Sequence, residues 1–370
     1  MILDPAWNLG LVPESCNVLS VNPFSGHSAG SAMITNLKIA NYGPIRNLQW
    51  ENPGPINLVI GENGSGKTFF LKALYTALRS VELFRRGDDR RDINEIIEEK
   101  LFWTFQTDKI TDIVARDGSG PLKCSMDIDE RPFSFSLASE KGKPKLTAKI
   151  KSGQRESNSV FLPAKEVLSL FGIILKSREQ DKLFGFDDTY LDLVKALQVP
   201  TSRGRKYLAF EKSRKGLESM LGGKVKYDQR STEWLFTKGR IKYNMHATAE
   251  GIKKIAILDT LLGNRHLDVN SVIFIDEPES ALHPKALTRF LDIIGAIAKL
   301  GIQFFIASHS YFVIKKLHLI ARERGVSIPV QSIDGKGTWH AYDLLEGMPE
   351  NPIIDESVRL YEEEVGMAFE

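Results

Sequence analysis

The fold is decided by one stretch of the sequence, Gly61-Glu62-Asn63-Gly64-Ser65-Gly66-Lys67-Thr68. A short apolar run over residues 56–60 precedes it and predicts a buried strand, and apolar residues at helical spacing over 69–78 predict a helix after it. The glycines let the backbone bend so that successive N–H groups point at one centre, where a β-phosphate would lie. The stretch therefore predicts a strand, a phosphate-binding loop and a helix.

The residues of this loop suit a nucleoside triphosphate. The ammonium group of Lys67 reaches the β- and γ-phosphates, so we expect Lys67 to serve both binding and catalysis. The Thr68 hydroxyl is a ligand for Mg²⁺, and the helix that begins near Lys67 presents its positive end to the same anion. We therefore predict ATP and Mg²⁺ as cofactors. The predicted cofactor-binding residues of the loop are Gly61, Glu62, Asn63, Gly64, Ser65, Gly66, Lys67, Thr68 and Phe69.

The composition is typical of a globular protein whose net charge creates no strong electrostatic field. At 370 residues it can bury one large core or two lobes of ordinary size, and its net charge of +2 does not itself attract nucleic acid or a membrane. The most apolar stretch, residues 290–307, is interrupted by charged residues, so we expect no membrane partner. Cys16 and Cys124 are too few for a zinc site or a disulfide framework and favour a cytoplasmic setting.

The chain divides into regions of different composition, and the predicted fold class is α/β. Residues 1–32 are rich in Pro, Ser and Gly, which predicts an extended or disordered N-terminal segment. We expect a nucleotide-binding core over residues 33–83 and 231–370. Between them, residues 84–230 are expected to form an inserted α/β and helical lobe, with short strands followed by a helical block over 165–222.

Two further strands are expected to end in polar residues at the site. Residues 272–275 are apolar and lead into Asp276 and Glu277, and a ligand in an open α/β sheet lies beyond the carboxyl ends of the strands. We expect Asp276 to hold Mg²⁺ and Glu277 to orient or deprotonate the attacking water, although two acids at a strand end are often merely solvated. A third strand over 302–307 leads to His309, which we expect to reach the γ-phosphate, although a lone histidine is more often structural.

Together these residues resemble an ABC-type ATPase head of the SMC/RecF/OLD class. The resemblance rests on Gly61–Thr68, on Ile-Asp-Glu-Pro-Glu-Ser-Ala-Leu-His-Pro over 275–284, and on Ala-Ser-His-Ser over 307–310. It implies an ABC-type P-loop NTPase fold and an ATP hydrolase in which Asp276 and Glu277 form the second acidic motif. It also implies that residues 280–284 form the D-loop and that His309 is the switch histidine.

The family's signature sequence should lie just before a helix, and residues 248–254 offer the only candidate. This segment departs from the usual Ser-Gly-Gly-Gln pattern but keeps a hydroxyl at Thr248, one glycine at Gly251, and Glu250 between them. We expect these three residues to contact the γ-phosphate of a partner subunit from a helix N-terminus; a plain capped helix is the alternative. Gln106 is a weaker candidate for the family's Q-loop residue.

The resemblance leaves the biological role open. It implies two heads that close on two nucleotides, hence a homodimer or a larger even-numbered assembly. One hypothesis is an ATP-driven switch that controls a separately encoded, nuclease-like effector, as standalone OLD-like ATPases without a Toprim domain do in bacterial anti-phage defence. The alternative is a RecF-like repair ATPase that grips DNA, and a nucleotide-gated scaffold with little turnover is a third possibility. A neighbouring nuclease gene would favour the first hypothesis, and replication genes the second.

Basic clusters in the expected insertion leave nucleic-acid binding open as well. They are suited to a phosphate backbone, but acidic residues interrupt them, and a solvated charged face fits equally well. The clusters are Arg85, Arg86, Arg90 and Arg91; Lys141, Lys143, Lys145, Lys149 and Lys151; and Arg203, Arg205, Lys206, Lys212, Arg214 and Lys215. An acidic run from Asp355 to Glu370 predicts an exposed C-terminal helix.

Overall fold

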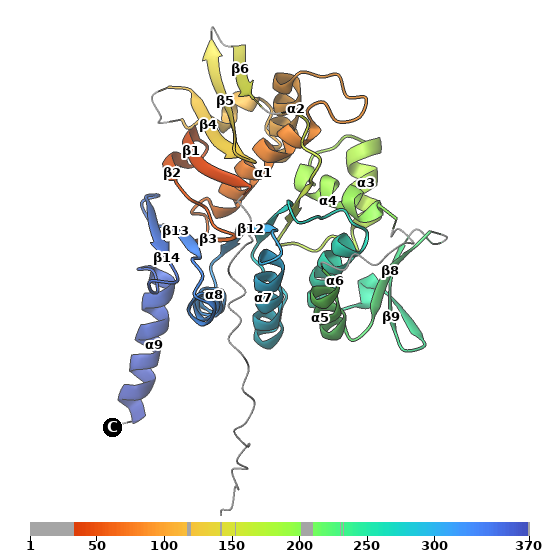
Figure 1. Ribbon diagram of the computed structural model, residues 1–370, viewed down its shortest axis with the longest axis vertical. Coiled ribbons are helices and arrows are strands. Elements are labelled where there is room, and N and C mark those ends of the chain that lie inside the picture. The colour runs from red at the N-terminus through yellow and green to blue at the C-terminus, as the bar shows by residue number, and fades with distance from the viewer. Residues whose placement is uncertain are drawn as a thin grey trace, which may run out of the picture. The chain divides into compact units, whose positions relative to one another are not determined.

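The structure is a computed structural model that describes residues 33–368, except 117–119, 141–142, 152, 201–209, 230 and 232. The predicted N-terminal segment, with Cys16, and the basic run from Arg203 to Lys206 lie outside the described residues, as does Lys141. The described part of the chain is α/β, as predicted (Figure 1). None of its helices has the length and apolar character needed to cross a membrane.

A six-stranded sheet in the order β14-β13-β3-β12-β11-β7 carries the phosphate-binding loop. Its neighbouring strands pair in parallel except for β13 and β14. Every residue of β3, β11 and β12 is buried, which explains why these strands are almost continuous apolar runs. The strands are β3 (Ile56–Gly61), β7 (Ser159–Leu162), β11 (Val272–Asp276), β12 (Gln303–Ser308), β13 (Pro329–Ile333) and β14 (Trp339–Asp343).

A five-stranded antiparallel sheet, β2-β1-β4-β5-β6, forms a second layer. Its strands are β1 (Ile34–Tyr42), β2 (Ile45–Trp50), β4 (Leu122–Ile128), β5 (Arg131–Glu140) and β6 (Lys143–Ile150). Strands β4 to β7 fall in the range expected for the inserted lobe, yet β4 pairs with β1, and β7 pairs with β11. The segment that stands apart from the two large sheets is therefore shorter than residues 84–230. The alternating apolar residues of β4, for example, are buried in the core of the second layer.

Helices cover both faces of the six-stranded sheet. Leu58 and Ile60 of β3 belong to the same core as α6, α7 and α8, whereas Val59 belongs to a core with α1 and the five-stranded sheet. In Figure 1 the helices α6, α7 and α8 lie below the sheet, and α9 projects at one side. These helices are α1 (Lys67–Leu83), α6 (Glu250–Gly263), α7 (Pro284–Ala298), α8 (Tyr311–Arg324) and α9 (Pro352–Ala368).

The remaining elements lie around this core. Helix α2 begins at Ile93 because the Asp92 side chain caps its first turn. The predicted helical block is divided into short pieces and is followed by a three-stranded sheet, β10-β9-β8. These elements are α2 (Ile93–Phe105), α3 (Phe171–Leu175), the π-helix η2 (Lys176–Gln180), α4 (Asp188–Gln198), α5 (Glu211–Leu221), β8 (Lys224–Asp228), β9 (Glu233–Lys238) and β10 (Ile241–Asn244). Short 3₁₀ turns are η1 (Ile110–Ile113) and η4 (Met245–Ala247).

A buried ion-pair network ties α4 to α1 and α2. The Nζ atom of Lys100 on α2 lies 2.7 Å from Asp188 Oδ2 and 2.9 Å from Asp192 Oδ2, and both aspartates belong to α4. The Tyr75 hydroxyl of α1 donates to the same Asp192 oxygen over 2.8 Å. The three charged side chains are no more than 11% exposed, so each depends on its partners for the solvation that water would give. The helical block is thereby anchored to the helix that follows the phosphate-binding loop.

We predict that Lys100→Met lowers the free energy of unfolding by about 3–5 kcal/mol, because it leaves two buried carboxylates without a shared cation. Urea unfolding followed by circular dichroism measures the change. Lys195→Met is the control: Lys195 pairs with Glu179 at the surface, where their side chains are 50% and 45% exposed, and such pairs contribute little. Equal unfolding curves for the two variants would show that the network does not stabilise the fold.

Candidate functional site

The phosphate-binding loop connects β3 to α1, as predicted. Gly66 precedes α1 with φ of 101°, in the left-handed region that favours glycine. Lys67 is the first residue of α1, and its Nζ donates to the carbonyl oxygens of Gly61 (2.8 Å) and Glu62 (2.7 Å). The Ser65 hydroxyl is buried and has no hydrogen-bond partner among the described residues. A cation and an unpaired hydroxyl at the start of a helix fit a phosphate group.

The other predicted residues of the loop differ in their surroundings. Glu62, Asn63 and Gly64 are exposed at the tip of the loop. The Phe69 ring packs against Tyr42 and Phe105, with ring centroids 5.4 and 4.6 Å apart. The Phe69 side chain therefore belongs to the core of the second layer, and any contact of this residue with a nucleotide falls to its backbone.

Thr68 and Asp276 meet although 208 residues separate them. The Thr68 Oγ1 atom lies 3.0 Å from each carboxylate oxygen of Asp276. Both β3 and β11 pair in parallel with β12, so their carboxyl ends share one edge of the sheet. Burial raises the pKa of Asp276 to about 6, and the hydrogen bond from Thr68 opposes this rise.

A hydroxyl beside a carboxylate suits Mg²⁺, which takes oxygen ligands. The described residues contain no group of three or more His, Cys, Asp or Glu side chains that could hold a metal ion by themselves. This agrees with Mg²⁺ in nucleotide sites, where one or two protein groups act together with phosphates and water. Thr68 and Asp276 are therefore the residues that fit a Mg²⁺ ion brought by a nucleotide.

Glu277 and His309 lie together at the same edge. The His309 Nδ1 atom is 3.3 Å from Glu277 Oε1 and 3.5 Å from Glu279 Oε1. Glu279 Oε1 also accepts hydrogen bonds from the Ser308 hydroxyl (2.8 Å) and the His309 N–H (3.1 Å), so it joins the loops that follow β11 and β12. The side chains of Glu277 and His309 are 30% and 40% exposed and remain accessible to water. The linking role of Glu279 was not predicted.

The predicted signature segment lies at the exposed start of α6. The helix is preceded by Ala249, whose side chain makes no capping bond, and the Thr248 hydroxyl donates to a backbone carbonyl of the preceding turn. Thr248 therefore does not cap the helix. A Cβ atom on Gly251 would lie 2.8 Å from the carbonyl oxygen of Ala281, so the close approach of α6 to this loop requires glycine. Glu250 is exposed beside it.

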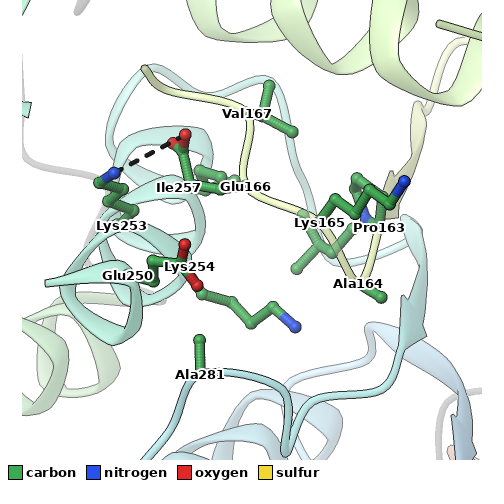
Figure 2. A pocket seen from close by; sticks show the side chains of 11 residues that line it. Pro163, Ala164, Lys165, Glu166, Val167, Glu250, Lys253, Lys254, Ile257 and Ala281 are labelled. Atoms are coloured by element: carbon green, nitrogen blue, oxygen red, sulfur yellow. Dashed lines mark ion pairs between the residues drawn. The ribbon is translucent and has the colours of Figure 1, made fainter. Parts of the chain in front are cut away.

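A small pocket separates α6 from the loop after β7 (Figure 2). Its volume of about 20 Å³ admits a water molecule but no nucleotide. Lys254 extends into it and donates to the carbonyl oxygen of Glu277 (2.8 Å) and to the Ser280 hydroxyl (2.9 Å). Burial lowers the pKa of Lys254 to about 8, against the opposing effect of nearby carboxylates. Sequence reasoning did not single out Lys254, although its position one turn after Gly251 was a usable signal.

Gln106, the weaker candidate for the Q-loop residue, makes no hydrogen bond with the residues at this edge of the sheet among those described. It ends α2, where its side chain donates to the Phe186 carbonyl (2.8 Å) and accepts from the Gly185 N–H (3.0 Å). The strand that pairs with β11 is β7, which is far from Gln106 in the sequence. The segment that follows β7 lines the pocket in Figure 2.

Three comparisons place the chain among known proteins. A family model described as "AAA domain, putative AbiEii toxin, Type IV TA system" matches residues 56–315. The DNA replication and repair protein RecF of Francisella tularensis subsp. mediasiatica (strain FSC147) is 33% identical over 85 residues, which are 22% of this chain and 24% of RecF. RecF of subsp. novicida (strain U112) matches to the same extent. The chain thus spans about a quarter of the length of the curated relatives it matches.

Solved structures similar to this chain include SMC heads. The SMC head domain from Thermotoga maritima has a TM-score of 0.45 and 13% identity, and the match covers 84% of this chain and 98% of that one. A Pyrococcus furiosus Smc head domain, with an extended coiled coil and bound to the C-terminal domain of ScpA, has a TM-score of 0.48 and 11% identity; this match covers 89% of this chain and 98% of that one.

The family match takes in the whole site at the sheet edge. Its limits enclose the phosphate-binding loop, Asp276, Glu277 and His309, and they span most of the chain. The sequence-based prediction of an ATPase head of the SMC/RecF class is confirmed. The chain belongs to the AAA-domain family of AbiEii type and is an ABC-type ATPase head.

Proposed function

We propose that this protein is a Mg²⁺-dependent ATPase that dimerises around ATP and acts as a nucleotide-driven switch for a separately encoded effector. One observation carries the proposal: the Thr68 hydroxyl lies against both carboxylate oxygens of Asp276, directly before Glu277. A metal-binding pair, a carboxylate and the His309 imidazole are thereby gathered at the sheet edge where the phosphate-binding loop begins.

The residues of this site have separate tasks in the proposed hydrolysis. The loop and Lys67 bind the phosphates and hold them in place. Glu277 orients a water molecule and accepts its proton, and His309, 3.3 Å from that carboxylate, fixes the Glu277 side chain and faces the terminal phosphate. Mg²⁺, when bound by Thr68 and Asp276, neutralises charge on the phosphates.

A second subunit would complete each site. Ala249 and Glu250 at the start of α6 are exposed, and no side chain caps the helix there. A helix N-terminus attracts a phosphate group, and a symmetric pair of heads would place each α6 against the nucleotide of the other. We therefore propose a homodimer or a larger even-numbered assembly that forms when ATP binds.

The biological setting that we propose is bacterial anti-phage defence. The description of the matching family, which names an AbiEii toxin and a type IV TA system, is compatible with this setting. In such a setting, closing and opening of the two heads would control a nuclease-like effector encoded by another gene.

A second candidate, a RecF-like DNA-binding ATPase, is favoured by the outer face of the five-stranded sheet. Lys38, Ser125, Ser134 and Lys149 lie in one row across β1, β4, β5 and β6, and Lys123 lies in the next row. These lysines are exposed, because the alternate residues of the same strands are buried, or partly buried in β6. The row offers small polar side chains bordered by cations, which suits a phosphate backbone.

For this second candidate we predict that the double variant Lys123→Glu with Lys149→Glu binds duplex DNA at least tenfold more weakly at about 0.1 M salt. The slope of the logarithm of the binding constant against the logarithm of the salt concentration should also become less steep by about two. Fluorescence anisotropy with a labelled duplex measures both quantities. Lys336→Glu, in the exposed turn between β13 and β14, serves as the control. If the unmodified protein, the double variant and Lys336→Glu bind DNA equally, or if none of them binds, the lysine row is a solvated surface and does not bind DNA as a RecF-like role requires.

We predict that Lys67→Ala and Glu277→Gln fail at different steps. Lys67→Ala removes the cation that faces the phosphates and lowers ATP affinity about 100-fold or more. Glu277→Gln keeps ATP affinity but lowers kcat by about 10² to 10⁴, because the amide cannot take a proton from water. Binding of a fluorescent ATP analogue and phosphate release measure the two effects. Equal losses of affinity in both variants would contradict these roles.

We predict that ATP drives association of the Glu277→Gln protein and that Ala249→Asp, added to it, prevents this. Aspartate is a favourable residue before a helix, so it leaves α6 intact, but its charge opposes the partner's γ-phosphate. Ala249→Asn caps the helix without a charge and is the matched control. Gly251→Asp is less suitable, because its side chain would meet the Ala281 carbonyl.

Sedimentation velocity with and without ATP and Mg²⁺ measures this association. The informative quantity is the change that ATP causes, so that any association present without nucleotide is not counted. A Glu277→Gln protein that binds ATP and stays monomeric at micromolar concentration would show that the head-to-head mechanism does not apply.

A further inference from the structure

Lys254 is a buried cation behind the predicted catalytic loop, residues 276–284, and the hydrolysis described above does not use it. Only 8% of Lys254 is exposed, and its Nζ donates to the carbonyl oxygen of Glu277 and to the Ser280 hydroxyl. The Ser280 oxygen also lies 3.0 Å from the carbonyl oxygen of Ala164, in the loop after β7. In Figure 2 the Lys254 side chain spans the gap between α6 and these two loops.

The backbone of Glu277 needs such support. Its φ of 46° lies in the left-handed region, which is strained for a residue other than glycine. The N–H of Glu277 donates to the Ala307 carbonyl over 2.9 Å, and Lys254 holds the carbonyl group of the same residue. The direction in which the Glu277 carboxylate points thus depends on a contact from α6.

Helix α6 contacts the catalytic loop at two points. Gly251, in its first turn, touches the catalytic loop at Ala281, and Lys254, one turn later, touches the same loop at Glu277. A helix of 14 residues moves as a rigid element, so a displacement of its N-terminus also moves Lys254. Burial lowers the pKa of Lys254 to about 8, and the carboxylates of Glu279, Asp276, Glu277 and Glu250 oppose this fall and favour the charged form.

We propose that Lys254 is a positioning residue that transmits the position of α6 to Glu277 of its own subunit. Glu277 is then set for water activation when the exposed end of α6 meets the nucleotide of the partner subunit. This inference rests on the proposed function, because it takes the head-to-head dimer as given.

The first test separates positioning from folding and from binding. Lys254→Met keeps the apolar stem of the side chain and removes the ammonium group; we expect kcat to fall at least tenfold and ATP affinity to change less than twofold. Lys253→Met is the matched control, since Lys253 is as buried on the same helix but bonds to Ser169 and lies 3.7 Å from Glu166. Lys254→Arg should recover part of kcat, because it keeps a donor at this place.

A second measurement is independent of turnover. In the Glu277→Gln background, Lys254→Met should leave ATP-induced association unchanged in sedimentation, because the phosphate-binding residues and the end of α6 are intact. A lost association, or a kcat equal to that of Lys253→Met, would overturn the proposal.

Mixed dimers show in which subunit Lys254 acts. Lys67→Ala has an intact α6 but no working phosphate-binding loop, so in a mixed dimer with Ala249→Asp the only nucleotide lies in the Ala249→Asp subunit and meets an intact α6. The α6 of that subunit meets no nucleotide, so its own Glu277 is not set. We therefore expect ATP to join the two proteins while hydrolysis stays at least tenfold below that of the unmodified protein. Mixing Lys67→Ala with Lys254→Met should restore nothing, because the only working loop lies in the subunit that lacks the lysine. Restored activity in either mixture would overturn the proposal. In the first mixture it would show that Glu277 does not need its own α6 at a partner's nucleotide, and in the second it would place Lys254 across the interface.

The mixtures also keep the two proposals apart. If ATP joins the subunits of neither mixture in sedimentation, the head-to-head dimer fails, and with it the coupling to a partner's nucleotide. A tenfold fall in kcat for Lys254→Met relative to Lys253→Met would then still support its hold on Glu277 within one subunit.

Discussion

The parallel pairing of β3, β12 and β11 is the constraint on which the site depends. Parallel strands end at the same edge, so a loop that binds phosphate, a pair of acids and a histidine meet there although the chain between them is long. The 3.0 Å contact between Thr68 and Asp276 is the direct result of this register. A shift of one residue in β12 would move its side chains to the opposite face and break both neighbouring alignments at once.

Sequence reasoning succeeded where the determinants are local. The loop after β3 has its own glycine pattern, and the helix expected over 69–78 lies within α1. The proximity of Asp276 and His309 to the loop was also predictable, because apolar strands of this kind end at one edge whatever lies between them. These parts of the fold and of the site require only the chain's own periodicity and the geometry of a parallel sheet.

The rest depends on pairings that no local pattern specifies. The alternation of β4 indicates a half-buried strand but not its partner, so strands that seemed to belong to an insertion proved to be part of the large sheets. Lys254 and Glu279 gain their roles from contacts between separate loops and from the rotation of α6 about its axis. Charged residues at such positions look like surface residues in the sequence. Burial of a charged group is favourable only where hydrogen-bond partners surround it, and the sequence does not show where those partners lie.

The order of strands also has a consequence for biosynthesis. Strand β3 pairs with β12, and Ile56 aligns with Phe304, 248 residues later. At roughly 5–20 residues per second, a ribosome needs about 10 to 50 s to supply that partner. Throughout this time an apolar strand with unpaired edges remains exposed in the nascent chain, a condition that favours aggregation. Production of this protein should therefore benefit from slow induction at low temperature or from added chaperones more than from any change to its surface.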